Sequence, residues 1–160
     1  MNKHENRPLL QVAQDGETDI IVRRSFHHPA SQVWRAMTDP ALIPKWMASR
    51  DTMTRCEIDL RPGGSFYYEW RGGQENSFHF SGPILEVKPP HRMIHVEYFN
   101  GHEETGTTVE TILEATGFGT RMTIVMRYAD AEARTAAIKM GMTDGLDRVY
   151  ENLEALLDAE

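Results

Sequence analysis

AEARTAAIKMGMTDGLDRVYENLEALLDAE, residues 131–160, is the stretch that decides the fold of this chain. Its apolar side chains recur in steps of three and four, which places them on one face of an α-helix. They are Ile138, Met142, Leu146, Val149, Leu153, Leu156 and Leu157. Asp130 is placed to cap the helix, and Glu132 lies in the first turn, where the helix dipole favours a carboxylate. We predict one long amphipathic helix whose apolar face lies on another element.

Two glycines, Gly141 and Gly145, interrupt this helical pattern. Each costs up to ~1 kcal/mol relative to alanine inside a helix. Being four residues apart, they share one flank of the helix and let another group approach closely. Close packing against a curved sheet explains them, and a ligand beneath the helix is the alternative.

Composition limits the classes of protein to consider. A chain of 160 residues forms one domain with its own core. The net charge of -7, without a run of basic residues, argues against a nucleic-acid partner. Cys56 is the only cysteine, which excludes an internal disulfide and indicates a reducing compartment. No apolar run approaches the ~20 residues of a membrane span, so we expect a cytoplasmic protein.

The first third of the chain combines one strand with two short helices. Residues 1–18 are mostly polar and are expected to form a flexible tail with room for one short strand, before a domain over 19–160. Alternation predicts a strand over 19–27. A helix follows over 31–38, and Asp39-Pro40 ends it and starts a second helix that reaches Trp46 or Met47.

The middle of the chain has a period of two from Thr54 to Tyr128, which predicts about six antiparallel strands. The predicted fold class is therefore α+β: a curved antiparallel sheet of about six to seven strands wrapped on a long C-terminal helix, with two short helices after the first strand. A curved sheet and a straight helix do not match along their full length, so we expect a hollow between them.

Five segments, taken in order, resemble the START-like (SRPBCC) superfamily, in the branch named for the activator of heat-shock protein 90 ATPase. They are RSFHHPASQVWRAMTDPALIPKWM (24–47), CEIDLRPGGSFYYEW (56–70), SGPILEVKPPHRMIHVEYF (81–99), GTRMTIVMRY (119–128) and MGMTDGLDRVYENLEALL (140–157). The turn DLRPGG, residues 59–64, is the most specific piece. The resemblance spans residues 19–157 and implies the helix-grip fold.

The resemblance also implies several functions, because such relatives include co-chaperone domains, lipid or hormone binders and polyketide cyclases. This chain departs from the family pattern at two positions. Met142 stands where the family usually has Trp after the glycine, and Met47 stands where a second Trp often follows Trp46. Both positions line the hollow in such folds, so the shape of the cavity is expected to differ.

Aromatic and methionine side chains supply the candidate ligand-binding residues. They form an ordinary core, or they line a cavity suited to a flat or hydrophobic ligand. The predicted ligand-binding set is Trp46, Phe66, Tyr68, Trp70, Phe80, His95, Phe99, Met122 and Met142.

His95 and Glu97 share one face of a strand and form the one arrangement that resembles a general acid-base pair. Solvated strand residues explain the pair equally well, so no catalytic residue is assigned. The other histidines show no metal-ligand spacing, and no phosphate loop, nucleophile elbow or dinucleotide fingerprint is present. We therefore expect neither a metal nor a cofactor.

Three function classes follow. The first, which we favour, is non-catalytic binding of a hydrophobic small molecule in the hollow. The second is a co-chaperone-like module whose partner is a heat-shock protein 90-type ATPase, and the third is a cyclase-type enzyme. Ligand binding requires a contiguous apolar cavity, and a co-chaperone requires an exposed patch over a filled core. A cyclase-type enzyme requires a buried polar pair.

Overall fold

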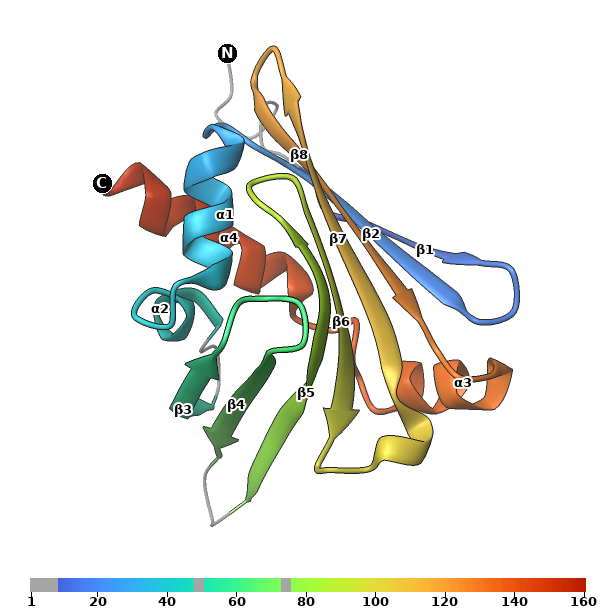
Figure 1. Ribbon diagram of the computed structural model, residues 1–160. Coiled ribbons are helices and arrows are strands. Elements are labelled where there is room, and N and C mark those ends of the chain that lie inside the picture. The colour runs from blue at the N-terminus through green and yellow to red at the C-terminus, as the bar shows by residue number, and fades with distance from the viewer. Residues whose placement is uncertain (1–8, 48–50, 73–75) are drawn as a thin grey trace.

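The computed structural model describes residues 9–47, 51–72 and 76–160 (Figure 1). Its main element is an eight-stranded antiparallel sheet. The strands are β1 (Gln11–Asp15), β2 (Asp19–Phe26), β3 (Thr52–Ile58), β4 (Ser65–Arg71), β5 (Ser77–Lys88), β6 (Arg92–Phe99), β7 (Thr107–Thr116) and β8 (Gly119–Arg127). The predicted α+β helix-grip class and its order of elements are confirmed. The Gly72-Gly73 pair also predicts a loop over 72–77 between two of these strands, and this loop falls partly outside the described residues.

The strands lie in the order β1-β2-β8-β7-β6-β5-β4-β3. All but one pair of neighbours follow one another in the chain, and β2 instead pairs with β8, with Ile20 opposite Met126. The sheet has one strand more than the predicted six to seven. The additional strand is β1, which pairs with β2 across a turn at Gly16. It is the short extra strand for which the sequence left room, and all five of its residues are exposed.

Two short helices, α1 (Ala30–Thr38) and α2 (Ile43–Met47), follow β2 as predicted. Asp39 separates them: its carboxylate accepts a hydrogen bond from the Ala41 amide at 2.8 Å. The Trp46 indole nitrogen donates to the Ala36 carbonyl oxygen at 2.8 Å. This buried hydrogen bond fixes α2 against α1.

The predicted single helix over 131–160 is wrong in one respect, because the structure divides it into α3 (Ala131–Lys139) and α4 (Leu146–Asp158). Gly141 adopts φ of 85°. Its amide donates to Ile138 at 3.0 Å, and the Met142 amide donates to Ala137 at 3.1 Å. These paired bonds form a Schellman motif, in which a left-handed glycine ends the helix. Asp130 caps α3 as predicted, accepting from the Ala133 amide at 2.7 Å.

The two helices have different roles on the sheet (Figure 1). α4 contacts α1 and α2, and it buries Tyr150, Leu153 and Leu157 in the main core. α3 has no fully buried residue. It is held at the other end of the sheet, where Arg134 Nη1 donates to the Gly16 carbonyl oxygen at 2.9 Å in the β1–β2 turn. α4 therefore completes the core, whereas α3 covers the sheet without filling the space below it.

A candidate ligand-binding cavity

A cavity of about 740 Å³ lies between the sheet, the 140–145 turn and the helices. Its floor comes from β3 to β8, one end from α1 and α2, and its roof from α3 and the start of α4. The lining residues are Met37, Trp46, Met47, Ile58, Phe66, Tyr68, Phe78, Phe80, Ile84, Met93, His95, Glu97, Phe99, Thr105, Thr107, Val109, Thr111, Ile124, Met126, Tyr128, Ala133, Ala136, Ala137, Met140, Gly141, Met142, Leu146 and Tyr150. Aromatic and aliphatic side chains dominate this surface, as in small-molecule sites.

Small side chains on α3 explain why the space stays open. Ala133, Ala136 and Ala137 face the cavity, and a methyl group cannot span the gap between a helix and a sheet that a leucine would fill. α4 instead directs Leu153 and Leu157 into the core. The break at Gly141 thus separates a helix that packs tightly from one that roofs a hollow.

Most of the predicted ligand-binding residues line this one cavity. Those that do are Trp46, Phe66, Tyr68, Phe80, His95, Phe99 and Met142. Trp70 does not; its ring lies beyond the cavity, stacked on Phe78 at 5.2 Å between ring centres. Met122 does not either; it is fully buried in the main core and is not among the lining residues.

The lining also contains aromatic and charged residues outside the predicted set, among them Phe78, Glu97, Tyr128 and Tyr150. Sequence signals for them exist. Tyr128 continues the alternation of β8, and Phe78 continues that of β5. Tyr150 lies four residues after Leu146 and three before Leu153, on the apolar stripe of α4.

Trp46 and Tyr150 form the end wall of the cavity. Their rings stack at 6.1 Å between centres, with 29° between the planes. Phe26 meets the other side of Tyr150 edge-on at 6.3 Å. Aromatic pairs in these geometries stabilise packing beyond the area they bury, so this wall joins the cavity rigidly to the core.

His95 and Glu97 place a polar group on the cavity floor. Nε2 of His95 lies 3.0 Å from Oε1 of Glu97, and the His95 ring meets Phe66 edge-on at 5.0 Å. Nδ1 of His95 is buried without a hydrogen-bond partner. One histidine nitrogen is therefore occupied by Glu97 and the other is shielded, while the carboxylate is the more exposed member of the pair.

Three tyrosines around the cavity respond to Glu97. Burial first, and then the Glu97 charge, raises the pKa of Tyr128 to about 12. The pKa of Tyr150 is raised by the same two causes, against an opposing effect of the Arg24 charge, and that of Tyr68 is raised by burial, Cys56 and Glu97. All three hydroxyls therefore stay protonated at neutral pH and remain hydrogen-bond donors.

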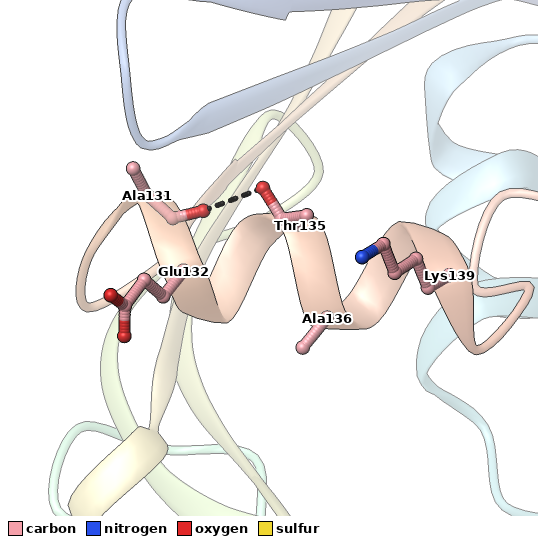
Figure 2. Close-up of a pocket in the computed structure, with 5 residues that line it drawn as sticks. All are labelled: Ala131, Glu132, Thr135, Ala136 and Lys139. Atoms are coloured by element: carbon pink, nitrogen blue, oxygen red, sulfur yellow. Dashed lines mark hydrogen bonds between the residues drawn. The ribbon is translucent and has the colours of Figure 1, made fainter.

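A second hollow, of about 330 Å³, lies along α3 and shares Ala136 with the larger cavity (Figure 2). Ala131, Glu132, Thr135, Ala136 and Lys139 line it, and the Thr135 hydroxyl donates to the Ala131 carbonyl oxygen at 3.0 Å. All five residues come from one helix, so no second element forms an opposing wall. We therefore place the candidate site in the larger cavity.

Two further classes of site are absent from the described residues. No group of three or more histidine, cysteine, aspartate or glutamate side chains is arranged there to hold a metal ion. No helix in the same part of the chain is long and apolar enough to cross a membrane.

Residues 27–158 match the sequence family described as activator of Hsp90 ATPase homolog 1-like protein. The chain belongs to this family. The match includes both short helices, β3 to β8, α3 and α4, and it therefore contains every element that lines the cavity. The predicted resemblance is confirmed.

Solved structures of relatives support the same fold. A protein from Rhodobacter sphaeroides is 31% identical with a TM-score of 0.87, over 94% of this chain and 99% of that one. A protein from Nitrosomonas europaea is 31% identical with a TM-score of 0.81, over 91% of this chain and 97% of that one. An AHSA1-like protein from Aeromonas hydrophila, 23% identical with a TM-score of 0.72 over 86% and 93%, shares the fold. No curated protein matches the sequence.

Proposed function

We propose that this family member binds a hydrophobic small molecule, without catalysis, in the cavity between the sheet and α3. The observation that carries this proposal is the single contiguous volume of about 740 Å³ lined mainly by aromatic rings and methionines. Its size lies within the range of roughly 300–1,000 Å³ typical of ligand pockets. Methionine side chains adapt to ligands of different shape.

Met142 gives the cavity part of its room. It follows the glycine that ends α3, and its side chain reaches the lining although its backbone belongs to the turn. The sequence comparison with the family predicts a larger Trp at this position. A methionine there leaves volume that a ligand can occupy.

A catalytic role of the cyclase type would rest on His95 and Glu97. The two side chains form a hydrogen-bonded pair on the cavity floor. General acid-base catalysis requires a nitrogen within reach of the substrate, and in this structure neither nitrogen of His95 offers one. The arrangement therefore favours binding over proton transfer by His95.

A co-chaperone role is the second candidate, and the family description is the observation that favours it. The net charge of -7 makes electrostatic attraction to a basic partner surface the physical basis for such a contact. Association with the host's heat-shock protein 90-type ATPase would then weaken as salt screens the charges. A pull-down at low and at moderate salt tests this role, and no association at low salt would remove it.

The binding proposal is tested first by native mass spectrometry of the purified protein, which should reveal a retained apolar adduct. A panel of flat aromatic and fatty-acyl compounds is then titrated, with tryptophan fluorescence and thermal melting as readouts. A ligand at a hundredfold excess over its Kd stabilises the fold by ~2.7 kcal/mol.

Two matched variants locate the binding. Met142→Trp should fill the cavity and abolish the ligand effect while the fold persists. Met53→Trp makes the same change on β3, at a residue that does not line the cavity, and should bind like the parent. If no compound shifts either signal in the parent, or if Met142→Trp binds as well as the parent, the proposal fails.

A further inference from the structure

The charged side chains that line the cavity carry negative charge only. Glu97 is the one carboxylate among the described lining residues, and no lysine or arginine is among them. Arg24 on β2 is a buried cation that lies over the Phe26 ring at 4.5 Å; its charge opposes the rise in the pKa of Tyr150, but it does not itself line the cavity. A negatively charged ligand would therefore meet Glu97 without a cationic side chain in the lining.

His95 does not change this balance for a ligand. Its Nε2 faces Glu97 at 3.0 Å, and its Nδ1 is buried away from the cavity surface. A ligand carboxylate therefore finds no free imidazole N–H to bind. The Glu97 carboxylate accepts one hydrogen bond from His95 in the structure, and it retains further acceptor capacity.

The walls around Glu97 favour a cation as well. Tyr68, Tyr128 and Tyr150 all lie close enough to Glu97 for its charge to raise their phenol pKa. The faces of aromatic rings attract a positive charge, more strongly where water is excluded. A partly desolvated carboxylate is itself stabilised by an opposite charge.

We infer, resting on the proposed function, that the ligand is a hydrophobic molecule carrying a protonated amine, with the ammonium against Glu97 and the apolar body between the sheet and α3. Such a ligand satisfies the carboxylate and leaves the apolar walls to the rest of the molecule. Fatty acids and other hydrophobic anions are disfavoured by the same geometry. The net charge of -7 adds attraction for a cation at long range.

Three compounds with one skeleton test this inference: naphthylethylamine, naphthylethanol and naphthylacetic acid. Their ring and arm lengths match, and at neutral pH they are cationic, neutral and anionic. Calorimetric titration into the parent protein should give a Kd for the amine at least about tenfold lower than for the alcohol. The acid should bind more weakly than the alcohol.

Two variants attribute the preference to Glu97. Glu97→Gln retains an acceptor for His95 but removes the charge, so the amine should lose its advantage over the alcohol. Glu104→Gln removes an equal charge from an exposed position in the short helix Glu103–Thr105, next to the lining residue Thr105. It should keep the preference of the parent.

The outcomes separate this inference from the function on which it rests. If the alcohol binds the parent as tightly as the amine, or the acid binds more tightly, the inference fails and cavity binding stands. If Glu104→Gln loses the preference and Glu97→Gln keeps it, the charge acts from outside the cavity and the inference also fails. If none of the three compounds binds, the inference and the proposed function fail together. The comparison in the parent does not depend on either variant folding.

Discussion

His95 Nε2 lies 3.0 Å from Glu97 Oε1 on the floor of a mostly apolar cavity. The two residues are separated by one residue on β6 and so project from the same face of the sheet. This contact fixes the imidazole and leaves the carboxylate as the accessible charge. The ligand preference that we propose therefore depends on Glu97, whose charge also raises the pKa of Tyr128.

Replacing Glu97 with glutamine should lower the pH at which Tyr128 loses its proton. Burial and the Glu97 charge together raise the pKa of Tyr128 to about 12, and the amide leaves only the effect of burial. Ultraviolet absorbance of tyrosinate during an alkaline titration measures this change. Glu104→Gln serves as the control and should titrate like the parent. An unchanged tyrosine titration in Glu97→Gln would show that the carboxylate does not act on the cavity hydroxyls.

Alkaline pH should destabilise the fold through the cavity tyrosines. Tyrosine in an unfolded chain has a pKa of about 10, whereas that of Tyr128 is raised to about 12 in the folded protein. The contribution of a group with a raised pKa is fully present below pH ~10 and is lost as the pH rises toward its folded value. The melting temperature of the parent should therefore fall over this window.

Tyr128→Phe isolates this effect, because phenylalanine has no proton to lose. Its melting temperature should fall less steeply than that of the parent between pH ~10 and ~12. Tyr98→Phe changes a tyrosine that does not line the cavity and serves as the matched control. Equal slopes for Tyr128→Phe and the parent would contradict the raised pKa.

Gly141→Ala should destabilise the protein by ~1–2 kcal/mol, because an L-residue other than glycine is strained in the left-handed region. The cause is the φ of 85°, and not the overpacking against a sheet that a continuous helix would predict. A side chain at Gly141 would meet only Asp144. Gly141→Asn should lose less stability than Gly141→Ala, since asparagine tolerates the left-handed conformation better.

Gly117→Ala is the control for this prediction, because a side chain there meets open space and φ is not in the left-handed region. It should change stability by less than about 0.5 kcal/mol. Denaturant unfolding of the three variants measures the differences. If Gly141→Ala is as stable as Gly117→Ala, the Schellman motif does not determine where α3 ends.

The order of elements could be predicted from the sequence because period two and period 3.6 alternate clearly along it. The break in the C-terminal helix was missed although Gly141 directly follows Lys139 and Met140, a typical helix end. The apolar stripe continues in phase from Ile138 through Met142 to Leu146, and this continuity outweighed the glycine signal.

The sequence also predicts which face of the sheet each strand residue lies on. It does not predict which residues of that face reach the cavity. Met122, Ile124 and Met126 alternate on one face of β8. All three belong to the main core, but only Ile124 and Met126 also reach the cavity floor. Trp70 likewise shares a face with Phe66 and Tyr68 but lies beyond the cavity. Where the cavity begins depends on the alanines of α3, and no period in the strands encodes that.

Binding inside the cavity is tested most directly by nuclear magnetic resonance of the methionine methyl groups. The chain has nine methionines. Some of them line the cavity and others lie outside it, so their methyl signals report on the two regions separately. Met93, Met126 and Met142 line the cavity, while Met122 is buried outside it and Met53 lies on β3 away from it.

Naphthylethylamine and naphthylethanol are titrated separately into protein with carbon-labelled methionine methyl groups. We predict saturable shifts of the Met93, Met126 and Met142 signals, while those of Met53 and Met122 stay in place. The absence of saturable shifts with either compound, or shifts confined to Met53 and Met122, would contradict ligand binding in the cavity.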